Sequence, residues 1–270
     1  MQNTMQHAYR LSAAAVRRRY AEQRPETLQA LDGLRQADVA VYTGTYDSVQ
    51  NVLKALGVPH TLDPKRLRQR IVFANCAGSY PAGRLKELEA HVRAGALLVT
   101  SDWALSRLVQ RAFPGMVRRA TKSTGDEVVG VEPTMDGLWS EVVVLGADPQ
   151  WWLEGSSEPI EVLDEAKVCV EASSHECLAK YGAPAVAVSF PWGCGRVFHV
   201  MSHFWLKRTR AGGRRHGEPG AAFLRDGMRL GDEAIRAAAK ASGVDPNALS
   251  FATVQSAATS TELVARLVAS

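Results

Sequence analysis

The sequence predicts an α/β fold in which a mostly parallel, open sheet is flanked by helices. Short apolar runs occur at 39–42, 71–74 and 96–100, and each is followed by small or polar residues. Segments with apolar residues at helical spacing separate these runs. The runs are apolar at nearly every position, which is typical of parallel strands that helices bury on both faces. We expect the three runs and 185–188 to lie in one mostly parallel sheet.

The helices before and between these strands are predicted from the spacing of apolar residues and from helix-capping and helix-ending residues. The segment 6–36 has apolar residues at helical spacing, with a break at Arg24-Pro25 because the residue before a proline disfavours helix. Asp47 or Ser48 is expected to cap the next helix, and Gly57 to end it. A short strand is expected at 60–62. Three helices are expected between the strands, at about 49–56, 85–94 and 103–113.

The second half of the chain has a different pattern. Short β-like runs at 128–131, 142–145, 160–163 and 167–170 indicate an antiparallel extension or insertion at about 116–172. Two strands around the turn 192–195 predict a β-hairpin. The region 219–270 is rich in alanine and predicted to be helical. The expected organisation is therefore an N-terminal helical extension (1–36), an α/β domain (37–206) containing the insertion, and a basic loop with C-terminal helices (207–270).

Composition excludes several classes of protein. The 270 residues are 46% hydrophobic and 22% charged, which is ordinary for a globular protein and unlike a disordered, fibrous or disulfide-dense chain. No apolar run approaches the roughly 20 residues needed to span a bilayer, and the polar start has no signal-peptide pattern. The four cysteines are scattered and expected to be reduced. A cytoplasmic protein is the default expectation.

Several blocks resemble one family. They are Val41-Tyr42-Thr43-Gly44, the Asn-Cys-Ala-Gly loop at 75–78, the helix and strand at 85–99, and Gly193-Cys194-Gly195-Arg196-Val197-Phe198-His199 followed by Ser202-His203. Together these resemble the class I glutamine amidotransferase-like superfamily, and within it the ThuA-like branch, named for the trehalose-utilisation protein. The resemblance covers roughly 37–115 and 184–206. It implies a flavodoxin-like, glutamine amidotransferase-like sheet.

The resemblance also implies where a nucleophile belongs. Catalytic members of the superfamily carry a cysteine on a strained turn after a strand, within Gly-x-Cys-x-Gly. Here the corresponding strand, 96–100, leads into Ser101-Asp102-Trp103, which has neither the cysteine nor the flanking glycines. ThuA-like proteins also lack it, so the resemblance implies the fold more than a reaction.

The carboxyl ends of parallel strands meet at one edge, which is where ligands bind in open α/β sheets. We expect Thr43, Cys76, Ser101 and His203 to converge there. The candidate catalytic residues are Cys76, Ser101, Asp102 and His203. The candidate ligand-binding residues are Thr43, Gly44, Tyr46, Asn75, Ser79 and Trp103.

Each candidate has a structural alternative. Cys76 precedes a helix whose N-terminus would favour a thiolate, but free cysteines are commonly small buried hydrophobes. Ser101, Asp102 and His203 could form a hydrolase-like trio, but Ser101-Asp102 before an apolar helical run is also typical of a helix N-cap. His203 could equally be a core histidine.

No metal and no cofactor are expected. His175, Cys177, His199 and His203 could be drawn as a cluster, but they lack paired-cysteine spacing, and two of them are not on one helical face. The sequence also has no P-loop and no dinucleotide-binding glycine motif after the first strand.

Basic residues are clustered at 17–19, 65–70 and 207–216, although the net charge is only +4. The segment from Lys207 to His216 contains no acid, and the candidate partner-binding residues within it are Arg208, Arg210, Arg214 and Arg215. Two adjacent tryptophans, Trp151 and Trp152, are further candidates for partner contact, the alternative being that both pack the insertion onto the sheet. A solvated surface is the alternative for the basic clusters. Otherwise they favour a protein partner, an anionic partner or nucleic acid, and no membrane.

Two functional hypotheses follow. The first is a non-catalytic binding or scaffold module of a bacterial multi-protein system, of stress or defence type by resemblance. The second is a small-molecule hydrolase or amidase that uses Cys76 or Ser101 with His203.

Overall fold

The computed structural model describes residues 2–76, 80–134, 149–202, 204, 207 and 209–270. Its main sheet has the strand order β2-β1-β3-β4-β12-β11-β10-β7. Five neighbouring strands are parallel: β2 (Thr61–Leu62), β1 (Val39–Tyr42), β3 (Ile71–Ala74), β4 (Leu97–Ser101) and β12 (Gly195–Val200). Three more strands continue the sheet in antiparallel pairing: β11 (Ala185–Trp192), β10 (Cys169–Ser173) and β7 (Glu132–Pro133). The predicted α/β class and the single, mostly parallel sheet are confirmed.

The predicted hairpin is β11–β12, closed by the two-residue turn Gly193-Cys194. Gly193 has a φ of +63°, and a Cβ there would lie 2.5 Å from the carbonyl oxygen of Arg93. The turn therefore requires glycine for both its backbone conformation and its close approach to the helix end. The hairpin places β12 beside β4, so a strand from late in the chain borders the first parallel strands.

The middle region is β-rich, as predicted. Strand β5 (Val117–Arg119) pairs with β9 (Ile160–Val162), which joins the edge of β11 at Ala185. Strands β6 (Glu127–Gly130) and β8 (Gln150–Leu153) form a separate two-stranded sheet. The predicted run at 142–145 lies outside the described residues.

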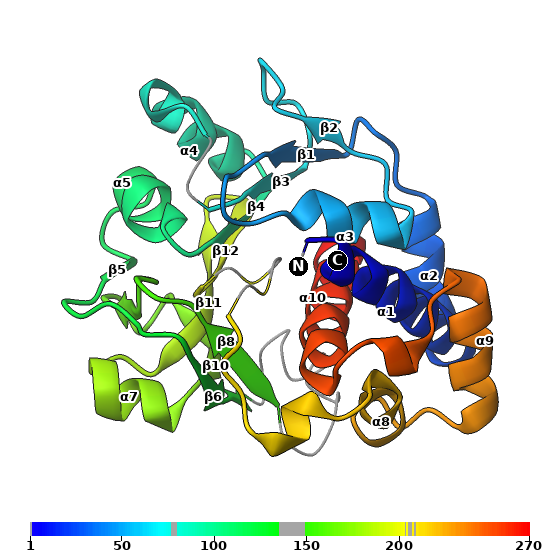
Figure 1. Ribbon diagram of the computed structural model, residues 1–270. Coiled ribbons are helices and arrows are strands. Elements are labelled where there is room, and N and C mark those ends of the chain that lie inside the picture. The colour runs from blue at the N-terminus through cyan, green and yellow to red at the C-terminus, as the bar shows by residue number, and fades with distance from the viewer. Residues whose placement is uncertain (1, 77–79, 135–148, 203, 205–206, 208) are drawn as a thin grey trace.

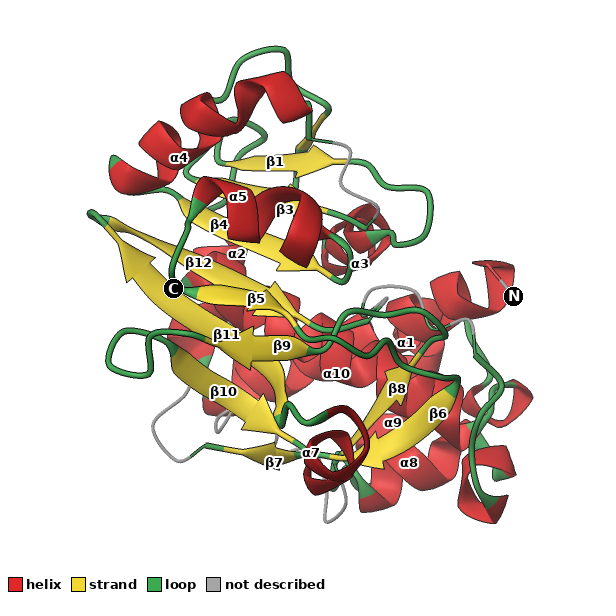
Figure 2. Ribbon diagram, turned by 90° about the vertical axis from the view of Figure 1, so that its left-hand side faces the viewer, coloured by secondary structure: helices red, strands yellow, loops and turns green. Residues whose placement is uncertain are grey.

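Helices cover both faces of the sheet (Figures 1 and 2). One face carries α4 (Leu85–Arg93) after a 3₁₀ turn (Ala82–Arg84), α5 (Gln110–Ala112) after a π-helical segment (Leu105–Val109), and near its lower end α7 (His175–Tyr181). The other face carries α3 (Val49–Leu56), α1 (Gln2–Gln23) and α10 (Phe251–Ala269). The outer helices are α2 (Pro25–Asp32), α8 (Gly220–Asp226) and α9 (Asp232–Ser242), with short 3₁₀ turns at Arg214–Gly217 and Pro246–Ala248.

The first predicted helix does break at Arg24, and Pro25 begins α2. Ser48 occupies the N-cap position of α3, but its side chain makes no capping bond. Instead the Oδ1 atom of Asn75 accepts a hydrogen bond from the Val49 amide at 3.2 Å. A residue from the neighbouring βα loop therefore replaces the expected local cap.

The terminal helices share one apolar core with the sheet. Tyr9, Leu11 and Tyr20 of α1 are fully buried, and α10 is buried around most of its circumference. A helix that is buried on nearly all sides lies within the core of the domain. The predicted boundaries at 36 and 206 remain predictions, but the helices beyond them belong to the packing of the sheet.

A buried ionic contact joins the two terminal helices. Glu262 of α10 is 1% exposed, accepts a hydrogen bond from the Tyr20 hydroxyl at 2.6 Å, and forms an ion pair with Arg19. Burial raises the pKa of Glu262, and Arg19 acts in the opposite direction. Because a buried carboxylate needs such partners, this contact aligns α1 and α10. No described helix is long and apolar enough to cross a membrane.

Candidate functional site

Asp102 lies on a strained turn directly after β4. Its φ is +46°, its amide donates to the Val200 carbonyl at 2.9 Å, and its own carbonyl accepts from the Leu105 amide at 2.8 Å. A non-glycine residue in this left-handed region is uncommon, although aspartate tolerates it better than most residues. Strand β4 is thus followed by a strained turn that carries a carboxylate.

The structure brings three candidate catalytic residues together. The Cys76 thiol lies 3.6 Å from Asp102 Oδ2, and the Cys76 amide donates to Ser101 Oγ at 3.3 Å. All three side chains are fully buried. The π-helical segment after Asp102 has Ala104 as its N-cap residue and no side-chain capping bond. The capping interpretation of Ser101-Asp102 is therefore wrong, because these side chains bond to the neighbouring loops instead.

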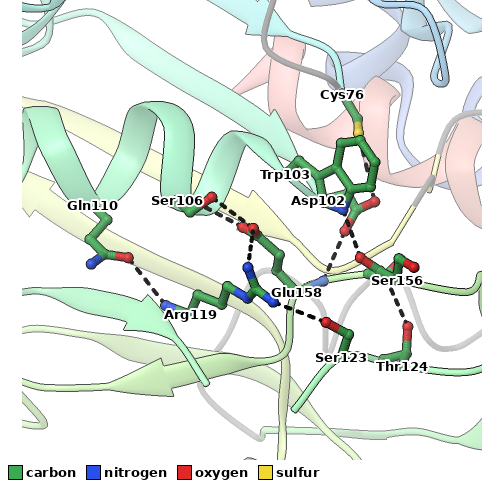
Figure 3. Close-up of polar contacts among 11 residues, drawn as sticks. Cys76, Asp102, Trp103, Ser106, Gln110, Arg119, Ser123, Thr124, Ser156 and Glu158 are labelled. Carbon is green, nitrogen blue, oxygen red and sulfur yellow. Dashed lines mark hydrogen bonds and ion pairs between the residues drawn. The ribbon is translucent and has the colours of Figure 1, made fainter. Parts of the chain in front are cut away.

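A buried glutamate that sequence reasoning missed completes this cluster (Figure 3). The Glu158 amide donates to Asp102 Oδ1 at 3.0 Å, and the Glu158 carboxylate accepts from the Ser106 hydroxyl at 2.7 Å and the Ser106 amide at 3.0 Å. Arg119 lies 3.7 Å from the same carboxylate. Burial raises the pKa of Glu158, and the Ser106 hydrogen bonds and Arg119 counteract this. Glu158 is 56 residues from Asp102 and belongs to no motif, so no sequence signal marked it.

Two predicted ligand residues, Tyr46 and Trp103, lie together. Their rings meet edge to face with centroids 5.5 Å apart, and the Trp103 indole donates to the Ser156 carbonyl at 2.7 Å. The Arg107 guanidinium lies over the Trp103 ring at 5.2 Å. Tyr46 is exposed and Trp103 half-buried, so this aromatic pair lies partly at the surface, beside the turn that carries Asp102.

The other described ligand candidates hold the loops in place. Thr43 donates through its amide and its hydroxyl to Asp63, at 2.9 and 2.7 Å. The side chain of Asn75 accepts a hydrogen bond from the Val49 amide and donates one to the Gln50 side chain, both in α3. At Gly44 a Cβ would lie 1.9 Å from the Cys76 carbonyl oxygen, so the two loops touch where only glycine fits.

His203 and Ser79 lie outside the described residues, so their predicted places at this edge stay predictions. Beside that edge, His199 of β12 is fully buried, with Nδ1 2.8 Å from the Thr100 hydroxyl. Its Nε2 atom has no hydrogen-bond partner among the described residues. Burial lowers the pKa of His199 to about 3, against the opposing effect of Asp102. In the described part of the chain, no group of three or more His, Cys, Asp or Glu could hold a metal ion.

The candidate partner-binding residues separate into two groups. Arg210, Arg214 and Arg215 are exposed, while Arg208 lies outside the described residues. Trp151 and Trp152 are 2% and 6% exposed, and the Trp151 indole donates to the Met201 carbonyl at 3.0 Å. The two tryptophans thus have the burial that the packing alternative expects, and neither presents a surface to a partner.

No family model and no curated protein sequence matches this chain. Among solved structures, a glutamine amidotransferase from Thermotoga maritima is similar with 11% identity and a TM-score of 0.49, over 86% of this chain and 96% of that one. A cytoplasmic protein from Salmonella typhimurium is similar with 12% identity and a TM-score of 0.44, over 63% and 89% of the two chains.

A β-galactosidase from Rahnella sp. R3 is also similar, with 13% identity and a TM-score of 0.40 over 62% of this chain. The match spans only 28% of the length of the Rahnella enzyme. A second β-galactosidase, Gan42B, is matched over 27% of its length. Such low identities carry no activity across.

Proposed function

We propose that this chain is a non-catalytic binding module, in which an α/β scaffold presents a basic loop to an acidic partner protein. The observation that carries the proposal is the state of Asp102. It occupies the turn where a nucleophile would be expected, yet its carboxylate is fully buried and bonded to the Glu158 amide and the Cys76 thiol. A nucleophile must reach a substrate and a base, whereas these oxygens are engaged by the protein itself.

The environment of Cys76 also favours a structural role. Reactive cysteines lie in partly exposed, electropositive surroundings that stabilise the thiolate. Cys76 is fully buried, and the group facing its thiol is a carboxylate. A thiolate there would lie beside a like charge, which opposes rather than assists the hydrolase or amidase alternative.

Alkylation rates test the non-catalytic part of this proposal. Under iodoacetamide at neutral pH, we expect Cys76 to react at least about tenfold more slowly than the exposed Cys194, because the reagent must reach a thiolate. Mass spectrometry of the digested protein over a time course would measure both rates. Cys177 is the internal control for burial, since desolvation raises the pKa of its thiol to about 11. If Cys76 reacts faster than Cys194, the enzyme alternative replaces the binding module.

The end of the basic loop, residues 213–216, is held by contacts with the rest of the chain. His216 accepts a hydrogen bond from the Gly213 amide through Nδ1 at 2.7 Å, and its Nε2 contacts the side chain of Gln150. The Arg215 guanidinium lies 4.7 Å from the centroid of the Phe251 ring. Holding the loop before binding reduces the entropy lost on association, which favours a specific contact with an acidic protein face.

Substitution of Arg214 and Arg215 by serine tests the binding part. With fluorescent poly-L-glutamate as the probe at low ionic strength, the double variant should bind at least about fivefold more weakly, because both cations are exposed. Fluorescence anisotropy would measure the affinity. The matched control is the double variant Arg66→Ser with Arg68→Ser, which removes the same charge from another exposed cluster. Equal losses in the two variants would contradict the proposal, and stronger binding of a single-stranded oligonucleotide than of poly-L-glutamate would identify a nucleic-acid partner instead.

Two narrower assignments are proposals that rest on the resemblance: the ThuA-like branch without its catalytic cysteine, and a place in a bacterial multi-protein system of stress or defence type. A cytoplasmic location is a third proposal, which does not rest on the resemblance. Binding without catalysis is compatible with all three.

A further inference from the structure

A cavity of about 420 Å³ lies between the basic loop and the first turns of α1 and α10. The loop contributes Lys207, Thr209, Arg210 and His216 to its lining, α1 contributes Thr4, and α10 contributes Thr253. These residues are distinct from the cluster around Asp102. The volume falls in the lower part of the range of small-molecule sites, roughly 300–1,000 Å³.

The cavity is positively charged. Lys207 and Arg210 line it, and among its described lining residues none is aspartate or glutamate. Glu154 lies close to Lys207 and accepts a hydrogen bond from the Thr209 amide at 3.2 Å. Burial lowers the pKa of Lys207, and the Glu154 carboxylate opposes this. Two cations and no described acid line the cavity, so its described lining carries an excess of positive charge.

The lining groups are already positioned. Lys207 Nζ donates to the Thr209 carbonyl at 2.7 Å and lies 5.7 Å from the centroid of the Trp152 ring. The Gly213 amide donates to His216 Nδ1, so the ring proton lies on Nε2, which faces the side chain of Gln150. These two contacts hold the end of the loop in place. A ligand would therefore meet Lys207 and His216 in positions that the protein already holds.

The N-terminal ends of α1 and α10, the two longest helices in the described part of the chain, both lie at this cavity. Met5 of α1 and Ala252 of α10 both line it, and Tyr20 and Glu262 meet farther along the same helices, so α1 and α10 run in the same direction. Each N-terminus carries a partial positive charge, which adds to the field of Lys207 and Arg210.

We propose that this cavity binds a small molecule through a phosphate group, with Lys207 and Arg210 as the charged contacts. Ammonium and guanidinium groups with nearby hydroxyl donors are the groups that recognise phosphate oxygens. The inference rests on the proposed function in that the chain binds its ligand without transforming it. An organic phosphate and free phosphate share this chemistry, and the experiment separates them.

Isothermal titration calorimetry of the full chain with AMP, inorganic phosphate and adenosine tests the proposal. AMP should bind at least about tenfold more tightly than adenosine, which lacks the charged group. Tighter binding of AMP than of phosphate identifies an organic phosphate as the ligand class, and equal binding identifies free phosphate. Equal affinities for AMP and adenosine, or no detectable binding of AMP and phosphate, would overturn the proposal.

Variants locate the binding. Arg210→Ser and Lys207→Met should each weaken AMP binding at least about tenfold, whereas Arg236→Ser, an exposed control on α9, should leave it unchanged. Arg210 is exposed, so its variant carries the test if Lys207→Met does not fold. A loss for Arg236→Ser equal to that for Arg210→Ser would mean general charge screening and reject the cavity. Arg214 and Arg215 are not among the described lining residues, so poly-L-glutamate binding and AMP binding can fail separately.

Discussion

Replacing Glu262 by alanine is expected to lower the free energy of unfolding by about 3–5 kcal/mol, because it leaves a largely buried guanidinium without its carboxylate. Arg19 is only 13% exposed, and the Tyr20 hydroxyl would also lose its acceptor. For a chain of this size such a loss corresponds to a melting temperature about 10 °C lower. Circular dichroism during thermal and urea unfolding would measure both quantities.

The matched control is Glu233→Ala. Glu233 also contacts an arginine of α1, Arg18, but at 3.8 Å and with the glutamate side chain 86% exposed. Its loss should change the free energy of unfolding by no more than about 0.5 kcal/mol. Similar effects of the two substitutions would mean that the buried contact does not hold α1 against α10.

Acidification is expected to destabilise the protein through His199. Burial lowers the pKa of His199 to about 3 in the folded chain, against about 6.5 when unfolded. Between these values the unfolded state binds a proton that the folded state does not, so stability is present above pH 6.5 and is lost as the pH falls. The loss should approach about 1.4 kcal/mol per pH unit, which gives roughly 2.7 kcal/mol at pH 4.5.

Comparison with His199→Gln isolates this effect from carboxylate titration. Urea unfolding at a series of pH values should give a shallower dependence for the variant, by close to one proton between pH 4.5 and 6. His175→Gln is the control, because it removes a histidine whose side chain is 80% exposed. Parallel profiles for the parent and His199→Gln would show that His199 is not the titrating group.

Much of the fold could be predicted because its signals are local. Apolar runs at 39–42, 71–74 and 96–100 become β1, β3 and β4, and the glycine-containing turn becomes the β11–β12 hairpin. Gly57 ends α3 in the left-handed conformation, as expected for a glycine after a helix. Contacts between segments that are distant in sequence could not be predicted in this way. The cap of α3, for example, comes from Asn75 in another loop and not from Asp47 or Ser48 beside the helix.

The candidate site shows the same division. Parallel strands end at one edge, so the proximity of Cys76, Ser101 and Asp102 followed from strand order. The hydrogen-bond partners and the burial of these side chains could not be predicted from strand order. Glu158 reaches Asp102 from the middle insertion, and the burial of both depends on loops that are distant in sequence.

The sequence by itself determined the α/β class, the strands that end at the candidate edge, and the clustering of positive charge between Lys207 and His216. These depend on residue order, because periodicity and composition act over a few neighbouring residues. Only the tertiary structure decided that Asp102 is sealed, that Trp151 and Trp152 are buried, and that α1 and α10 begin at one basic cavity. Burial and electrostatic environment depend on which distant segments pack together, and that packing is a property of the whole chain rather than of any segment.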